Sequence, residues 1–238
     1  MSITSNELNF LSELEKKYIS SISDITDIST NTTGNKKFIE MNFNSLHFDK
    51  VPAFYSDSYE NKECSSADTL IYSYHNDSLY LIEFKEGWPR HKDKTDSNSD
   101  IRLKCYDSIS KLCLFWVNIL GKSRRDFFDL KINYCLITRP KNGNLHHSAV
   151  NALNSTRQAF QLKMLENTLV DQTRILVTPN AIYKLLSRIT GVNNMAYVKS
   201  DGSKLISIKL PLSKYAFNPS LMEISNKSFS FLIDFVIS

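Results

Sequence analysis

The alternation of hydrophobic and polar positions along the chain predicts both helices and strands. Residues 6–22 repeat apolar side chains at helical spacing, and Ser5 can cap this first helix. Two runs rich in β-forming residues, 67–74 and 78–85, flank the turn-forming residues 75–77, which predicts a β-hairpin. The second of these runs is apolar on both faces, as is typical of a central, buried strand.

A long helix is predicted next, from residue 101 to residue 120, with Asp100 as its cap and Gly121 at its end. Apolar residues recur on one side of this helix at Cys105, Ile109, Leu112, Cys113 and Trp116. A polar line runs beside them at Lys104, Ser108 and Lys111. Residues 130–138 then predict a buried strand that ends before Pro140.

The rest of the chain gives weaker patterns. We expect a strand within residues 37–43, helices at 154–165 and 179–189, and short strands at 174–178, 204–210 and 229–237. Pro179 suits the first position of its helix, and Gly191 suits the end. No internal repeat or linker interrupts the pattern, so the sequence predicts a single α/β domain over residues 1–238.

The 238 residues have the composition of an ordinary soluble globular protein, with 42% hydrophobic and 23% charged residues. This composition excludes a disordered tail, a collagen and a mucin-like stalk. The net charge of +4 is compatible with a nucleic-acid partner without pointing to one. The 6 glycines form neither a GxGxxG nor a GxxxxGK[ST] motif, which excludes the dinucleotide-binding and P-loop NTPase classes.

The 4 cysteines, at positions 64, 105, 113 and 135, include no CxxC pair, so a zinc site is not indicated. Three of them fall in apolar patterns that are typical of buried free thiols. The first residues do not combine a basic region with an apolar stretch. No apolar run approaches the roughly 20 residues that cross a bilayer. We therefore expect a cytoplasmic protein without a membrane partner.

The predicted hairpin carries charged residues on a face that its pattern would bury. With a two-residue turn at Asn76–Asp77, Leu70 lies opposite Glu83 and Asp68 lies opposite Lys85. The three charged residues then share one face, and a turn lengthened by an even number of residues keeps them there, whereas a slip of one residue does not. Two carboxylates this close repel each other unless a cation lies between them, and oxygen ligands suit Mg²⁺. Lys85 is placed to orient or deprotonate a water molecule beside the metal.

This arrangement resembles the PD-(D/E)xK nuclease superfamily, whose fold is that of the restriction endonucleases. Asp68 matches the first acidic position of the family, and residues 83–85 (Glu-Phe-Lys) match the motif on the next strand. A helix follows the motif as in the family, and Ala67 stands where the family has a variable Pro. The resemblance covers somewhat more than half of the chain. It implies a mixed central β-sheet flanked by helices, with a restriction endonuclease-like core (α-β-β-β-α-β) at residues 5–140 and an α/β C-terminal extension at 141–238.

The resemblance also implies a chemistry, that of an Mg²⁺-dependent endonuclease. Asp68 and Glu83 would bind the Mg²⁺ ion, and Lys85 would help to position the attacking water. The substrate implied is a phosphodiester bond, most often in DNA. The setting implied is restriction or anti-phage defence, which the residues themselves do not show.

Two further positions enter through the resemblance. Many members add an acidic ligand from the first helix, for which Glu15 is the matching metal-ligand candidate, with Glu7 and Glu13 behind it. Glu15 interrupts the apolar stripe of that helix, a position that also suits the rim of a core. Many members also use a Lys or Gln on the helix after the motif, and Lys104 is the matching residue.

Candidate nucleic-acid contacts lie next to the motif. Trp88, Arg90 and Lys92 follow it directly, and Lys104 is on the next helix. An aromatic residue beside basic side chains can stack a base and hold phosphates, although an ordinary solvated loop has the same pattern. Arg139 offers a further phosphate contact or a simple surface charge. A homodimer or another protein partner is also compatible with the sequence.

Two other readings remain open. In the first, the chain is a non-catalytic nucleic-acid-binding or protein-assembly module on the same fold. In the second, it is an interaction subunit whose C-terminal half is the binding surface. If the hairpin is an ordinary surface hairpin, Glu83 and Lys85 are solvated and loosely paired, contributing at most about 1 kcal/mol. A complete set of Asp68, Glu83 and Lys85 facing one pocket favours the enzyme.

Overall fold

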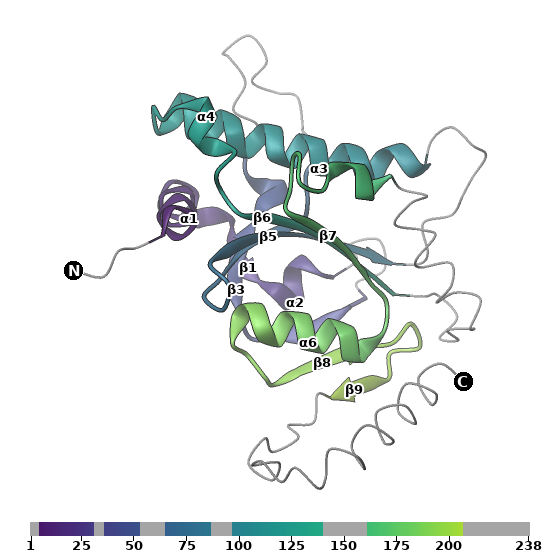
Figure 1. Ribbon diagram of the computed structural model, residues 1–238. Coiled ribbons are helices and arrows are strands. Elements are labelled where there is room, and N and C mark those ends of the chain that lie inside the picture. Colours follow the sequence, from purple (N-terminus) through teal and green to yellow (C-terminus); the bar gives the residue numbers. More distant parts are fainter. Residues whose placement is uncertain (1–4, 31–35, 53–64, 87–96, 140–160, 207–238) are drawn as a thin grey trace, which may run out of the picture.

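The computed structural model describes residues 5–30, 36–52, 65–86, 97–139 and 161–206. It is a mixed α/β structure, in which a central mixed sheet is flanked by helices on both faces (Figure 1), as the sequence predicts. No helix of these ranges is long and apolar enough to span a membrane.

The central sheet has six strands in the order β1-β3-β4-β5-β6-β7. Their bounds are β1 Ile22–Asp24, β3 Asn44–His47, β4 Thr69–Ser73, β5 Ser78–Glu86, β6 Ile132–Arg139 and β7 Gln172–Leu176. Pairing is antiparallel from β1 to β5 and parallel from β5 to β7. The parallel pair β5 and β6 is joined through a long helix, as parallel neighbours require. A second sheet, antiparallel, has the order β2-β8-β9, with β2 Ile39–Met41, β8 Met195–Val198 and β9 Lys204–Ile206.

Different helices cover the two faces of the central sheet (Figure 1). One face packs on α1 Asn6–Lys17, on α3 Ser97–Leu114 with its π-helical continuation η4 Phe115–Ile119, and on α4 Arg124–Phe127. The other face packs on α2 Ile25–Ile28 and α6 Pro179–Thr190, together with the small sheet. Short 3-10 turns complete the described chain: η1 Ile19–Ser21, η2 Phe48–Lys50 and η5 Leu162–Leu165.

Strand alternation decides which side chains meet which helices. Leu79 and Leu81 of β5 pack on the side of α1 and α3, whereas Tyr80 and Ile82 pack on the side of α6. Glu83 continues the first series, so the alternation directs it toward α3. The strand is buried along most of its length, which confirms the prediction of a central strand.

The hairpin register differs from the two-residue-turn prediction by two residues. Leu70 pairs with Leu81 rather than with Glu83, and the connecting loop runs over four residues, 74–77. Asp77 takes a left-handed conformation (φ 54°), and its carboxylate accepts a hydrogen bond from the Tyr72 hydroxyl, which closes the longer loop. Because the shift is even, the faces are unchanged.

Other elements depart from the sequence prediction in detail. The buried face of α1 is Glu7, Phe10, Leu11 and Leu14, one position away from the predicted stripe. The strand expected within 37–43 exists as β2 but pairs with β8 in the small sheet. Helix α3 begins earlier than predicted, at Ser97. Helix α6 has Pro179 and Gly191 at its ends as predicted.

Three predicted segments cannot be compared in full. Most of the expected helix at 154–165 lies outside the described residues, as do the end of the strand at 204–210 and all of the strand at 229–237. Cys64 also lies outside them, whereas the other three cysteines are free thiols.

Candidate active site

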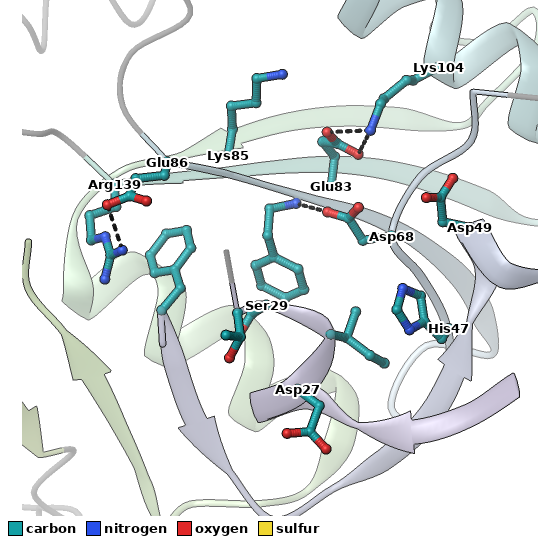
Figure 2. A pocket seen from close by; sticks show the side chains of 14 residues that line it. Asp27, Ser29, His47, Asp49, Asp68, Glu83, Lys85, Glu86, Lys104 and Arg139 are labelled. Atoms are coloured by element: carbon teal, nitrogen blue, oxygen red, sulfur yellow. Dashed lines mark hydrogen bonds and ion pairs between the residues drawn. The ribbon is translucent and has the colours of Figure 1, made fainter. Parts of the chain in front are cut away.

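A pocket of about 500 Å³ opens where β4, β5 and β6 approach α2 and α3 (Figure 2). Asp68, Glu83, Lys85 and Lys104 all line it. The structure therefore brings together four of the residues that the sequence singles out. Their catalytic and binding roles remain predictions.

Asp68 stands immediately before β4, beside the middle of β5. Its Oδ2 accepts a hydrogen bond from the backbone N–H of Phe84, at 2.6 Å. Its own backbone C=O accepts from the N–H of Phe48, at 2.9 Å. One step beyond the observed pairing of Thr69 with Ile82, Asp68 lies across from Glu83 rather than from Lys85.

Glu83 is buried, with a side-chain exposure of 2%. Both of its carboxylate oxygens accept hydrogen bonds from Lys104 Nζ, at 2.8 and 2.9 Å. Figure 2 shows Lys104 reaching down from α3 to Glu83, with Lys85 rising from β5 on the same side. The helix that follows the motif thus supplies the cation that partners its central carboxylate.

The two carboxyl groups are electrostatically strained. Burial, and after it the charge of Asp68, raises the pKa of Glu83 to about 8, although Lys104 and Lys85 act to lower it. Burial raises the pKa of Asp68 to about 6, against the influence of Lys104 and of the Phe84 N–H. The positive charge near these two carboxyl groups is too small to stabilise both of them in the ionised form, and a bound cation would supply the missing charge.

Lys104 alone does not neutralise this pair. Burial acts to lower the pKa of Lys104, but attraction to Glu83 and Asp68 outweighs it and the pKa rises. The contact of Lys104 Nζ with both oxygens of Glu83 is the geometry expected of an ionised carboxylate. The raised pKa of Glu83, in contrast, favours the protonated carboxyl group near neutral pH. Both follow from one cause, because a single ammonium group faces two buried carboxyls.

Asp49 and His47 line the pocket although the sequence does not single them out. Asp49, in η2, lines the pocket, and its Oδ1 accepts a hydrogen bond from Ser66 Oγ at 3.3 Å. His47, at the end of β3, lines it too, and its buried Nδ1 has no hydrogen-bond partner. Burial lowers the pKa of His47, so the imidazole is neutral near pH 7. The sequence pattern predicts an irregular connection from residue 48 onward and no element at residues 44–47, so it singles out neither Asp49 nor His47.

Helix α1 does not place Glu15, its predicted metal ligand, at the pocket. Glu15 is half-buried on α1 and is not among the pocket residues, and burial raises its pKa. Glu7 is buried and accepts the backbone N–H of Lys131 at 3.0 Å, and Glu13 forms an exposed ion pair with Lys16. The alternative prediction for Glu15, a carboxylate at the rim of the core, fits the structure.

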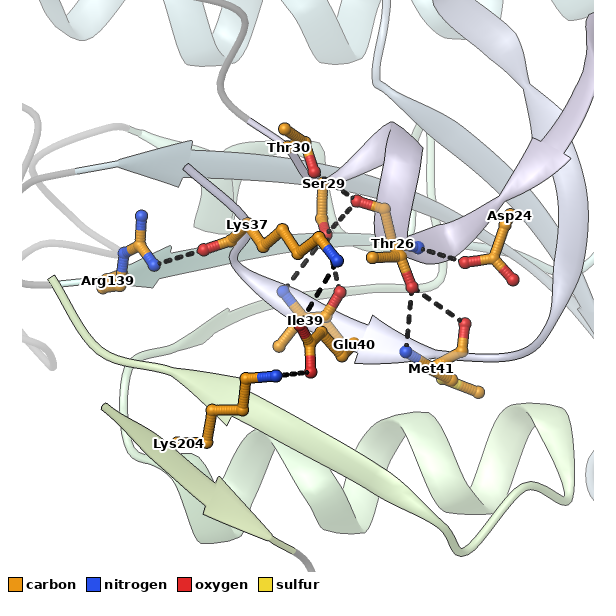
Figure 3. A network of polar contacts seen from close by, with 10 residues as sticks. All are labelled: Asp24, Thr26, Ser29, Thr30, Lys37, Ile39, Glu40, Met41, Arg139 and Lys204. Atoms are coloured by element: carbon orange, nitrogen blue, oxygen red, sulfur yellow. Dashed lines mark hydrogen bonds and ion pairs between the residues drawn. The ribbon is translucent and has the colours of Figure 1, made fainter. Parts of the chain in front are cut away.

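The wall of the pocket opposite α3 is lined by α2 with the two residues after it and by Phe38, which directly precedes β2. Polar contacts join α2 to β2 (Figure 3). The Ser29 hydroxyl accepts a hydrogen bond from the N–H of Ile39 at 3.2 Å and donates one to the C=O of Ile39 at 3.3 Å. The Thr26 hydroxyl does the same for Met41, at 3.0 and 3.3 Å. These hydroxyls hold Ser29 and its neighbours against the pocket.

Arg139 ends β6 and connects the two sheets. One guanidinium nitrogen donates to the C=O groups of Lys37 and Val198, at 2.7 and 2.6 Å, and another contacts Glu86 at 2.9 Å. The group also lies over the ring of Phe38. Arg139 is 1% exposed, so the structure assigns it to packing between the sheets, and the expected phosphate contact is not supported.

Replacing Arg139 by Met is expected to destabilise the protein by about 2–4 kcal/mol, because Glu86 and two backbone carbonyls lose their donor. Urea denaturation of the two proteins measures the difference. Arg124→Met, which removes an exposed arginine, should change stability by less than about 0.5 kcal/mol. Equal stability of the Arg139 variant and the wild type would contradict this role.

The remaining nucleic-acid candidates, Trp88, Arg90 and Lys92, lie outside the described residues. Within the described ranges, no three His, Cys, Asp or Glu side chains are arranged to hold a metal ion. The donor chemistry still suits Mg²⁺, because Asp68 and Glu83 offer carboxylate oxygens and no thiol lines the pocket. Mg²⁺ usually keeps several water ligands, so two carboxylates are an adequate protein contribution.

The charges around the pocket also favour a cation. Five carboxylates line it, at positions 27, 49, 68, 83 and 86, against the cations Lys85, Lys104 and Arg139. Arg139 and Lys104 are both engaged in ion pairs with carboxylates of this set. A phosphate group entering the pocket would meet net repulsion unless a metal ion entered with it.

Comparison with known proteins gives no relative for this chain. No family model, no curated protein and no solved structure matches it.

Proposed function

We propose that the protein is an Mg²⁺-dependent nuclease that hydrolyses phosphodiester bonds. The observation that carries the proposal is the set Asp68, Glu83 and Lys85 in one pocket, with burial raising the pKa of both carboxyls. The order α1, β3, β4, β5, α3, β6 supports a restriction endonuclease-like core, into which β1, α2 and β2 are inserted between α1 and β3. DNA as substrate and a defence role rest on the resemblance described above, whereas a cytoplasmic location rests on the sequence pattern alone.

In this proposal the chain contributes a metal cradle and an oriented water. Asp68 and Glu83 would hold Mg²⁺, which when bound supplies Lewis-acid stabilisation of the phosphate charge. Lys85 lies two residues beyond Glu83 on the same strand face and orients the attacking water by a hydrogen bond. The water oxygen would form the new bond to phosphorus and release a proton to solvent, while the bond to the leaving oxygen breaks and that oxygen takes up a proton from solvent. Lys104 balances the remaining charge on Glu83.

The test is incubation of the purified protein with supercoiled plasmid and Mg²⁺. We expect nicking or linearisation that stops in the presence of chelator and in the Asp68→Ala variant. A closed-circular plasmid that survives Mg²⁺ and Mn²⁺ would contradict the proposal, as would cleavage that persists in chelator. A single-stranded RNA of matched length, tested in parallel, decides between the two nucleic acids.

Metal binding should depend on pH in a defined direction. Metal ligands must be deprotonated, and the pKa values of Asp68 and Glu83 are raised to about 6 and about 8. Affinity for Mn²⁺ should therefore rise as the pH increases across this interval, with release of about one proton per metal near neutral pH. Calorimetry in two buffers of different ionisation enthalpy counts the protons. An affinity that does not vary with pH would contradict the assigned ligands.

One observation favours a second function. Lys104 contacts both oxygens of Glu83, and no third acidic ligand of the described chain closes the site. This arrangement suits a non-catalytic nucleic-acid-binding or protein-assembly module on the same fold. DNA binding that neither needs Mg²⁺ nor leads to cleavage would favour this second function.

A further inference from the structure

The polar line that the sequence places along α3 has a structural role at the pocket. Lys104, Ser108 and Lys111 are spaced by four and three residues, so they share one face of the helix. Lys104 binds Glu83 as described. The Ser108 hydroxyl accepts the N–H of Ala67 at 2.9 Å and lies 2.6 Å from the C=O of Lys104 as donor. Each turn of this face therefore makes a polar contact beside the site.

Lys111 is the innermost residue of this line. Its side chain is buried, at 2% exposure, and Nζ donates to the C=O of Phe48 at 2.8 Å and to Ser66 Oγ at 3.1 Å. The ammonium group also lies 4.6 Å from the ring centroid of Phe48. An ammonium group is costly to bury unless its contacts offset the lost hydration.

The groups that Lys111 contacts flank the acidic residues of the pocket. Ser66 donates to Asp49 and stands two residues before Asp68. Phe48 is bonded through its N–H to the C=O of Asp68, and it lies between His47 and Asp49 in the chain. A single buried cation thus connects η2 with the approach to β4.

We propose that Lys111 is a positioning residue of the site, which fixes the carboxylates of Asp68 and Asp49 by holding Phe48 and Ser66. This inference adds a residue role to the proposed metal site, and it rests on the proposed function. Lys111 does not touch the pocket itself, since it is not among the residues that line it. Removing the ammonium group should loosen the η2–β4 junction while β5 and β6 keep their packing.

The test compares Lys111→Met with Leu112→Ala, a neighbouring core variant that lowers stability by removing apolar packing and leaves every polar contact of this junction in place. Hydrogen exchange is measured on the metal-free proteins at the amides of Phe48, Ala67 and Leu81. In Lys111→Met the first two should exchange at least tenfold faster than in the wild type, relative to Leu81. In Leu112→Ala all three should accelerate together through global unfolding. Equal acceleration in both variants would overturn the proposal.

A second variant guards against loss of folding. Ser108→Ala should accelerate the Ala67 amide and leave the Phe48 amide unchanged, which separates the two anchors of the junction. If this pattern is missing, or if Lys111→Met does not fold while Leu112→Ala does, Lys111 is a general structural residue and the proposal fails.

Function is read out separately. Lys111→Met should weaken Mn²⁺ binding about tenfold, and Leu112→Ala should leave it within twofold when both are measured well below their melting temperatures. A wild type that binds no metal contradicts the proposed function, and the exchange pattern still decides whether Lys111 positions the junction. Metal binding by the wild type with an unchanged affinity in Lys111→Met contradicts the positioning role alone.

Discussion

Replacing Glu83 by Gln is expected to reduce Mg²⁺-dependent cleavage by at least about 10²–10³-fold, because the phosphate charge loses its stabilising partner. The same change should leave the metal-free protein at least as stable as the wild type above pH 8. A plasmid-nicking assay and thermal unfolding without metal measure the two effects on the same samples. Functional groups often reduce stability in this way.

The direction of the stability effect follows from proton linkage. The pKa of Glu83 is raised from the ordinary 4.5 to about 8 in the folded protein, chiefly by burial. Between these values the folded state holds a proton that the unfolded state has lost, so the wild type loses stability as the pH rises. Gln does not titrate, so the stability of the variant relative to the wild type should increase across this interval and level off above it.

Glu86 provides a matched control on the same strand. It pairs with the buried Arg139 much as Glu83 pairs with Lys104. Glu86→Gln should lower stability modestly and leave cleavage intact. If Glu83→Gln behaves in the same way, with lower stability at every pH and no loss of activity, Glu83 is only a structural partner of Lys104.

Replacing Lys85 by Ala is expected to abolish cleavage by a different route, with a loss on the order of 10²–10⁴-fold, typical of a group that acts on the attacking water. Metal binding should persist, because Asp68 and Glu83 are unchanged. Calorimetric titration with Mn²⁺ beside single-turnover cleavage separates binding from chemistry. Loss of Mn²⁺ affinity in this variant would show that Lys85 organises the metal site itself.

A charge control accompanies this variant. Lys131→Ala removes an exposed lysine just before β6, at the end of the sheet away from the pocket. Its cleavage rate should stay within about twofold of the wild type. A comparable fall in both lysine variants would point to general attraction of the nucleic acid, which added salt would also weaken.

The face shared by Asp68, Glu83 and Lys85 could be predicted because side chains alternate strictly along a strand. The turn was predicted two residues too short, yet the error was even and changed only which residues stand opposite each other. Lys104 was predicted only through the family resemblance, which implies a Lys or Gln on the helix after the motif. The pairing of Lys104 with Glu83 depends on packing distances that spacing alone does not give.

Other parts of the site depended on contacts between distant segments. The apolar pattern of α1 fits two neighbouring stripes that differ by one residue, and packing on the core selected the one with Glu7, Phe10 and Leu14. Glu15 therefore turned away from the pocket. His47 ends a four-residue strand whose pattern is too brief to recognise, and Asp49 lies in the short turn that follows it. Only the pairing of this strand with β4 places both residues at the pocket.

The contacts between α2 and β2 also limit how the small sheet can grow. A strand edge normally offers unpaired N–H and C=O groups, to which a strand of another molecule can attach. On β2, β8 occupies one side, and the hydroxyls of Ser29 and Thr26 bond the N–H and C=O groups of Ile39 and Met41. Two side chains on a single helical turn therefore replace a neighbouring strand, and this edge is closed to intermolecular β-pairing.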